Sequence, residues 1–198
     1  MITFVMLVED GNLDNAVGTL ENNLPGFRET WNVLVLTKDK QYPKIRNRIY
    51  KTIDDMPNQE CRGECLVSYN EKASFEQARS FLKGFPGQSY VFLWVGNKMP
   101  IGSIQELENV DIANFFHAGI IGYGSKYYVV GDDKLYDHRI RFELKEAKEH
   151  ITEITALPNT SNVLARLTVL QMCDTTSDKI GLDARRKGYR NFLVKGGK

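Results

Sequence analysis

The chain has few features of a membrane, secreted or strongly charged protein. No run approaches the roughly 18 apolar residues of a membrane helix, and residues 1–8 show neither a basic leader nor a small-residue cleavage site. Cysteine occurs three times, an odd number that fits a reducing compartment. The net charge of +1 argues against polyanion binding through bulk charge. These absences predict a cytoplasmic globular protein.

Common phosphate-binding and metal-binding motifs are absent as well. Neither GxxxxGK[ST] nor a GxGxxG after the first apolar run occurs. Cys61 and Cys65 are separated by three residues but have no second ligand pair, so free thiols are the expected state. The sequence therefore contains neither a recognisable phosphate-binding loop nor a recognisable metal-binding cysteine motif.

An alternation of strand and helix patterns fills the first half of the chain. Strands are predicted at residues 2–8, 31–37, 64–70 and 89–95, and helices at 12–24, 44–55 and 74–87. Asn12 and Ser74 stand at the positions of helix caps. The alternation predicts an α/β fold with a mostly parallel sheet, right-handed crossovers and helices on both faces.

The second half is less regular. A helix, or a helix and turn, is expected at residues 103–119, and a strand or hairpin at 120–133. Residues 138–158 read as helix throughout or as strand then helix, and 161–174 as an amphipathic helix. We expect one domain over residues 1–178, followed by a frayed basic tail over 179–198.

Polar residues follow the predicted strands at their carboxyl ends, where parallel sheets bind ligands. Glu9 and Asp10 follow the first strand, and Asn97 follows the fourth. The second strand ends in Thr37, after which come Lys38 and Asp39. Polar loops are common in any protein, so this arrangement alone is weak evidence of a site.

Three stretches resemble family 2 glycosyltransferases of the GT-A fold: "ITFVMLVEDGNLDNAVGTLENNL", "WNVLVLTKDK" and "ASFEQARSFLKGFPGQSYVFLWVGNKMP". They cover about residues 2–100. The resemblance implies a single-domain, Rossmann-like fold and a nucleotide-sugar donor. It implies as nucleotide-binding residues Glu9, Asp10, Thr37, Lys38, Asp39, Arg79, Trp94 and Asn97.

The family's acidic metal motif falls on residues 94–97, where this chain has Trp94, Val95, Gly96 and Asn97. Mn²⁺ and Mg²⁺ are hard cations that prefer charged oxygen ligands. Without a carboxylate here the DxD motif is degenerate, and we assign no metal ligand and no definite cofactor.

Glycosyl transfer also needs a base and positive charge at the leaving diphosphate. Asp132 and Asp133 are the candidate catalytic base, with Asp137 and His138 as a second pair; a solvated Asp-Asp turn is the simpler alternative. Residues 179–198 hold seven basic residues against one acid. They offer Arg185, Arg186 and Lys187 as phosphate ligands.

The basic segment has other interpretations: a contact to nucleic acid, to an anionic membrane surface or to a protein partner, or a solvated tail. Two functions therefore stay open. One is a divergent glycosyltransferase with a nucleotide-sugar donor and a soluble acceptor, including a nucleic acid modified by a virus or mobile element. The other is an inactive GT-A-like module that binds or assembles with partners.

Overall fold

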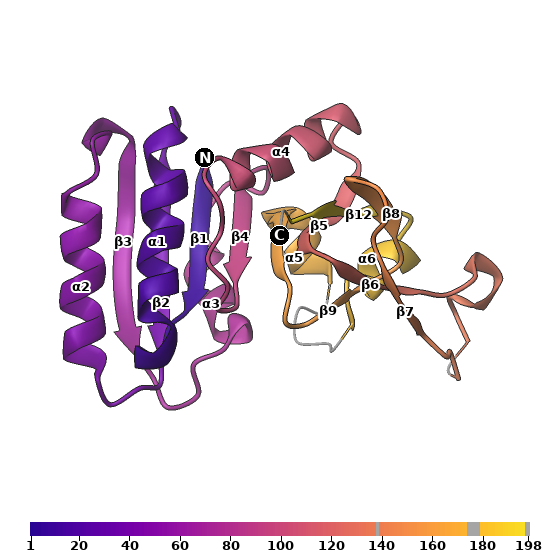
Figure 1. Cartoon of the computed structure of the whole chain (residues 1–198), viewed down its shortest axis with the longest axis horizontal. Helices are drawn as coiled ribbons and strands as arrows, with labels where there is room; N and C mark the ends of the chain where they lie inside the picture. The colour runs from indigo at the N-terminus through magenta and orange to yellow at the C-terminus, as the bar shows by residue number, and fades with distance from the viewer. Residues whose placement is uncertain (138, 174–178, 197–198) are drawn as a thin grey trace. The chain divides into compact units, whose positions relative to one another are not determined.

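The computed structural model describes residues 1–137, 139–173 and 179–196. The chain divides into two compact units, Met1–Glu106 and Leu107–Lys198. Helix α4, Ser103–Ala113, spans the division. Each unit has its own strands (Figure 1). Each also has its own buried side chains, and the candidate residues fall in both units.

A parallel sheet forms the centre of the first unit. Its strands are β1 (Ile2–Leu7), β2 (Trp31–Thr37), β3 (Arg62–Tyr69) and β4 (Tyr90–Trp94), in the spatial order β3-β2-β1-β4. All three neighbouring pairs are parallel. Every residue of β2 is buried, as expected of a strand covered on both faces. The predicted α/β class and the mostly parallel sheet of the first half are confirmed.

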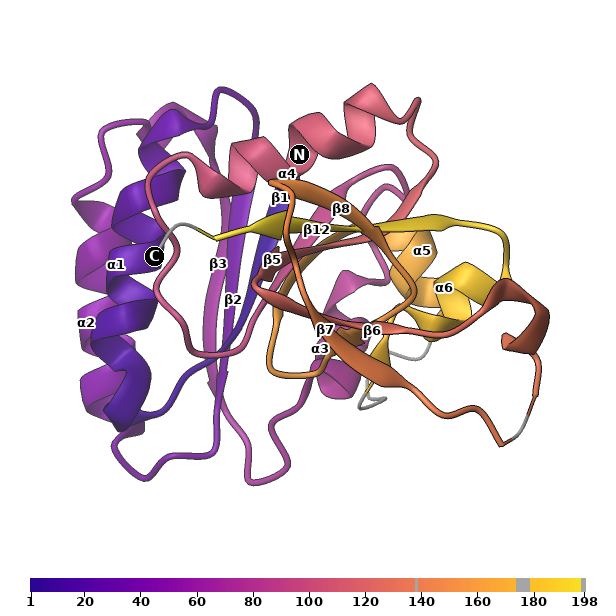
Figure 2. The same cartoon turned by 45° about the vertical axis from the view of Figure 1, so that its right-hand side comes forward.

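Helices cover both faces of this sheet. Right-handed crossovers put α1 (Leu13–Asn23) and α2 (Tyr42–Asp54) on one face and α3 (Phe75–Leu82) on the other (Figure 2). The predicted cap of α3 is confirmed, since the Ser74 hydroxyl accepts a hydrogen bond of 3.3 Å from the Gln77 N–H. Short 3-10 turns, Asp10–Asn12, Leu24–Gly26 and Gln59–Cys61, complete the connections.

The strand order reverses at β1. From β1 the chain adds β2 and then β3 on one side, whereas β4 pairs with the other side of β1. At this switch point the two connections do not diverge, because the chain leaving β4 runs along α1: the side-chain amides of Asn15 and Asn22 donate to the carbonyls of Gly96 and Met99. In open α/β sheets ligands bind beyond the carboxyl ends of the strands.

The second unit contains a mixed sheet. Its strands are β5 (Ala118–Gly124), β8 (Ile151–Ile154), β10 (Asn162–Arg166) and β12 (Arg190–Lys195), ordered β10-β5-β12-β8. β5 and β12 are parallel, and the two outer pairs are antiparallel. Two small ribbons pair β6 (Lys126–Val129) with β7 (Glu143–Glu146) and β9 (Leu157–Pro158) with β11 (Lys179–Ile180). The helices α5 (Leu167–Met172) and α6 (Leu182–Arg186) and the 3-10 turn Asp132–Lys134 complete the unit.

Three expectations for the second half are wrong. The helix expected at residues 161–174 is strand β10 followed by the short α5, because Val163 and Leu164 are both buried and fit either period. The helical reading of 138–158 fails because β7 pairs with β6 and β8 pairs with β12. The expected frayed tail is ordered over residues 179–195, since β12 pairs with β5 and β8. The division at residue 178 stays a prediction.

Across the described parts of the chain, no helix combines the length and the apolar character needed to cross a bilayer.

Candidate functional site

Asp39 connects the loops that follow β1 and β2. Its Oδ2 accepts a hydrogen bond of 2.8 Å from the Asp10 N–H, and its Oδ1 accepts one of 2.8 Å from the Gln41 N–H. Its own N–H donates to Oγ1 of Thr37, the last residue of β2, at 3.0 Å. The two backbone N–H groups, from Gln41 and then Asp10, and to a lesser degree Lys44, hold the pKa of Asp39 below its usual value.

Two lysines neutralise the acidic residues of the β1 loop. Nζ of Lys44, from the first turn of α2, lies 2.6 Å from Oδ1 of Asp10. Nζ of Lys38 lies 3.4 Å from Oε1 of Glu9. The contact with Asp10 raises the pKa of Lys44. Both pairs are exposed and add little stability, but they place cations and anions together at the carboxyl edge of the sheet.

The loop after β4 is attached to the start of α1. The Asn15 side-chain amide donates to the carbonyl of Gly96 at 3.0 Å. Gly96 has φ of +129°, a conformation that favours glycine, and a Cβ there would lie 3.7 Å from Nδ2 of Asn12. Asn12 in turn accepts a hydrogen bond of 2.8 Å from the Glu9 N–H. The loops on the two sides of the switch point are thus connected.

Trp94 acts on this loop from within the core. Its side chain is fully buried, and its Nε1–H donates to the carbonyl of Asn97 at 2.7 Å. The indole therefore fixes the turn that carries Asn97, and Asn97 itself is exposed. Arg79, the remaining candidate of the first unit, lies in α3, on the opposite face of the sheet from α1 and α2.

A small hollow marks the ends of β1 and β2. It has a volume of about 60 Å³ and is lined by Leu7, Val8, Glu9, Leu36, Thr37, Lys38 and Ala73. Small-molecule sites usually measure about 300–1,000 Å³. A nucleotide at this edge would therefore lie across the loops and place only part of itself in the hollow.

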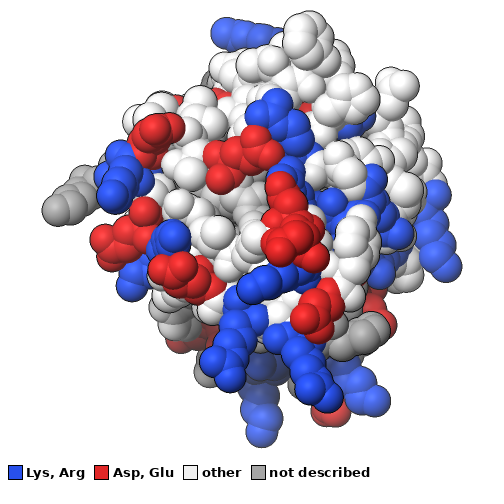
Figure 3. Space-filling view, turned by 90° about the vertical axis from the view of Figure 1, so that its right-hand side faces the viewer, with Lys and Arg blue, Asp and Glu red and all other residues white. Residues whose placement is uncertain are grey.

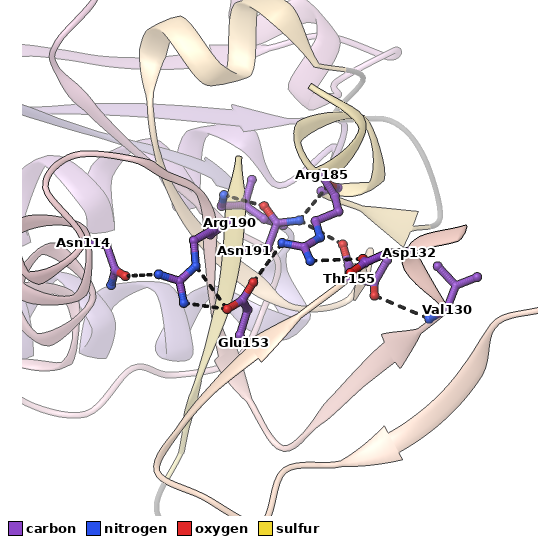
Figure 4. A network of polar contacts seen from close by, with 10 residues as sticks. Asn114, Val130, Asp132, Glu153, Thr155, Arg185, Arg190 and Asn191 are labelled. Carbon is purple, nitrogen blue, oxygen red and sulfur yellow. Dashed lines mark hydrogen bonds and ion pairs between the residues drawn. The ribbon is translucent and has the colours of Figure 1, made fainter. Parts of the chain in front are cut away.

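The candidate base and the candidate phosphate ligand of the second unit bind each other. Oδ1 of Asp132 accepts a hydrogen bond of 3.1 Å from Arg185, whose other guanidinium nitrogen donates to Glu153 at 2.8 Å (Figure 4). Arg190 also donates to Glu153, at 2.6 Å. The hydrogen bond from Arg190 and the charges of both arginines hold the pKa of Glu153 below its usual value. Asp133, next in the same 3-10 turn, is exposed.

The other basic residues of this segment also lie near acceptors. Arg186 donates from Nε to the carbonyl of Leu135 at 3.0 Å and lies 3.6 Å from Asp183. Lys187 is exposed. On the face of the molecule shown in Figure 3, acidic side chains lie among the basic ones. The excess charge of residues 179–198 is therefore partly balanced by acids from elsewhere in the unit; His138 and Lys198 lie outside the described residues.

The structure brings together Glu9, Asp10, Thr37, Lys38 and Asp39 in the first unit, and Asp132 and Arg185 in the second. Sequence reasoning missed Lys44, Asn12 as a loop support, and Asn15. Lys44 had a usable signal, since it lies one turn into the helix that follows the second strand. No sequence signal indicated Asn15, because its hydrogen-bond partner is a backbone carbonyl 81 residues away.

By sequence, no protein-family model and no curated protein matches the chain. By structure, it is similar to a CMP:2-keto-3-deoxy-manno-octonic acid synthetase complexed with CTP, with a TM-score of 0.56 and 10% identity over 100% of this chain and 90% of that one. It is also similar to a cytidylyltransferase from Leptospira borgpetersenii serovar Hardjo-bovis, with a TM-score of 0.54 and 10% identity over 100% of this chain and 76% of that one.

A third similar structure is TarS from S. aureus, with a TM-score of 0.50 and 10% identity over 98% of this chain and 57% of that one. Identities this low show a common fold alone. The chain shares an α/β fold with these three proteins.

Proposed function

We propose that the chain binds a nucleotide sugar at the carboxyl edge of its first unit and transfers the sugar to an acceptor. The observation that carries this proposal is the Asp10–Asp39 hydrogen bond, which joins the loops after two neighbouring strands at the carboxyl edge of a parallel sheet. In open α/β sheets ligands bind beyond the carboxyl ends of the strands. The similar structures support a nucleotide ligand through their fold.

The carboxylates of this edge suit the nucleoside. Each oxygen of Asp39 accepts one backbone hydrogen bond and keeps a lone pair for a further donor, such as a ribose hydroxyl. The backbone bonds also fix the orientation of the carboxylate before any ligand arrives. We assign Asp39 to the nucleoside and Asp10 to the support of its loop.

The diphosphate needs positive charge when the glycosidic bond breaks. The residues at 94–97 do not fit a hard divalent cation, and no group of three or more His, Cys, Asp or Glu side chains with metal-binding geometry occurs among the described residues. Lys38 and Lys44 already lie at this edge. We assign this charge to these lysines.

The transfer step itself needs a base. A carboxylate takes the acceptor's hydroxyl proton, the acceptor oxygen bonds to the anomeric carbon, and the bond from that carbon to the diphosphate oxygen breaks. Asp132 and Asp133 stay the candidates. Oδ1 of Asp132 already accepts a hydrogen bond of 3.1 Å from Arg185.

A thermal-shift screen of UDP, GDP, CMP, CTP and several nucleotide sugars, each with and without Mn²⁺, tests the proposal. A ligand at about 100 times its Kd stabilises by roughly 2.7 kcal/mol, a shift of several degrees. We expect a shift with one nucleotide class, independent of Mn²⁺, that is lost in Asp39→Ala and kept in Glu71→Ala, an exposed carboxylate of the same unit. No shift with any nucleotide overturns the proposal.

An inactive binding module is the second candidate function. The missing carboxylates at 94–97 and the ion pair of Asp132 favour it. Release of nucleoside diphosphate from the bound nucleotide sugar separates the two, since a module that only binds releases none. A shift with CTP but with no nucleotide sugar would instead indicate nucleotidyl transfer.

A further inference from the structure

Positive charge gathers on α2 and the loop before it, although the helix ends at Asp54 and Arg48 and Lys51 line a hollow together with Glu21 and Asp55. Residues 40–53 contain five basic residues and no acid, whereas the whole chain has a net charge of +1. The basic residues are Lys40, Lys44, Arg46, Arg48 and Lys51, and all five are exposed. This local charge is hidden in the overall composition and is separate from the basic segment at residues 179–198.

Helical spacing aligns three of these residues. Lys44, Arg48 and Lys51 are four and three residues apart, so they lie on one stripe of the helix surface. At about 1.5 Å per residue the stripe is about 10 Å long. Fully buried Ile45 and Ile49 fix the opposite side of the helix in the core. The basic side chains therefore belong to a helix that is held in place by the core, at the outer side of the first unit (Figure 1).

Most of these cations are not neutralised. Lys44 pairs with Asp10, and Arg46 lies over the Tyr50 ring at 5.7 Å. In the part of the chain that the structure describes, no carboxylate pairs with Lys40, Arg48 or Lys51. Arg185 and Arg190 of the C-terminal segment differ, since Glu153 binds both. Lys40, Arg48 and Lys51 should therefore attract a polyanion more strongly than Arg185 and Arg190 do.

The apolar and aromatic side chains near these basic residues indicate which class of polyanion they would bind. A peripheral membrane helix places large apolar side chains in the bilayer, and none is exposed over residues 40–53. Single-strand binders stack bases on aromatic rings. Here the hydroxyls of Tyr42 and Tyr50 are bonded to the β3 carbonyls of Val67 and Cys65, at 3.2 and 3.3 Å. The face thus offers charge without an apolar wedge or an open stacking platform.

We propose that the outer face of α2 binds the phosphate backbone of a nucleic-acid duplex without reading its sequence. Unpaired Lys and Arg side chains gain by releasing the counterions condensed on a duplex. The proposal does not depend on the nucleotide site and concerns a different surface from residues 179–198.

The test is the binding of the full chain to a fluorescein-labelled duplex of about 20 base pairs, from about 50 to 200 mM salt. Four phosphate contacts would give a slope of log K against log salt of about −3.6. The variant Lys40→Gln/Arg48→Gln/Lys51→Gln should reduce that slope by roughly 2.7 and weaken binding roughly tenfold or more. Lys44 is kept because it binds Asp10.

A control variant removes the same charge elsewhere: Lys72→Gln/Lys83→Gln/Lys148→Gln, all exposed. A loss confined to the α2 variant supports the proposal. Equal losses in both variants, or no duplex binding by the wild type, overturn it. Tighter binding to phosphatidylserine vesicles than to the duplex, lost in the same α2 variant, overturns it in favour of a membrane. Single variants Arg48→Gln and Lys51→Gln, each with a slope change of about 0.9, serve if the triple variant does not fold.

Discussion

The Asp10 N–H donates a hydrogen bond of 2.8 Å to the carboxylate of Asp39, 29 residues along the chain. Because these residues follow neighbouring strands, one carboxylate fixes the relation between two loops at the carboxyl edge of the sheet. Gln41 uses the other oxygen of the same carboxylate. Both interactions need Asp39 in its charged form to be strongest.

We predict that Asp39→Asn lowers stability at neutral pH and much less in acid. The folded pKa of Asp39 is below its unfolded value, so its stabilising contribution is present above the unfolded pKa and is lost as the pH falls through the folded pKa. Urea unfolding of both proteins between about pH 7 and about pH 2 measures this difference. A difference that does not change with pH would show that the charge is irrelevant.

The pair of arginines on Glu153 supports a second prediction. Glu153→Gln and Arg190→Gln should each cost about 1 kcal/mol, and their double-mutant cycle should give a coupling energy of about 0.5–1 kcal/mol that falls with added salt. The lowered pKa of Glu153 means that this contribution, too, disappears as the pH falls through that pKa.

Glu143 and Lys145 provide the matched control for that cycle. They pair at 3.3 Å on the exposed strand β7, without a second cation. Their coupling energy should be near zero, as for many exposed ion pairs. Equal coupling in the two cycles would mean that the Glu153 network adds nothing beyond an ordinary surface pair.

The first half of the fold could be predicted because its elements are strongly patterned. Residues 31–37 form a largely apolar segment that is buried throughout and has the predicted bounds. The second half could not, because its strands lack such patterns. β7 has one apolar residue among its four exposed ones, while β10 is short and continues directly into α5. There the pairing between distant strands decides the structure, and a local sequence window does not contain it.

The same limit applies to the candidate site. Position after a strand was enough to identify Asp10 and Asp39, since parallel strands bring such loops together. It did not identify Glu153, which lies in β8 and gains its importance from arginines 32 and 37 residues away. It also missed Asn191, a polar residue next to the apolar run of β12, which composition alone does not distinguish from a surface residue.

Asn191 supports a third prediction. It is fully buried, its Nδ2 donates to the carbonyls of Thr155 and Gly181 at 2.9 and 2.8 Å, and its Oδ1 accepts from the Ile120 N–H at 3.1 Å. Asn191→Ala leaves three buried backbone groups without these bonds, so we expect a loss of about 3 kcal/mol. Chemical denaturation measures it, with exposed Asn159→Ala as the control. A loss under about 1 kcal/mol would show that water replaces the amide.

Phe115 supports the fourth prediction, in which the substitution should leave the stability unchanged or raise it. It has φ of +55° and is 84% exposed, so its ring contributes little burial while its backbone adopts a left-handed conformation. That conformation costs a non-glycine residue about 1–2 kcal/mol, whereas glycine loses about 0.5–1 kcal/mol more chain entropy on folding. Phe115→Gly should therefore be neutral or stabilising by up to about 1 kcal/mol. Ala113→Gly, at the end of α4, should cost up to about 1 kcal/mol in the same thermal and urea measurements. If Phe115→Gly destabilises as much as Ala113→Gly, the left-handed backbone is not the dominant cost at this turn.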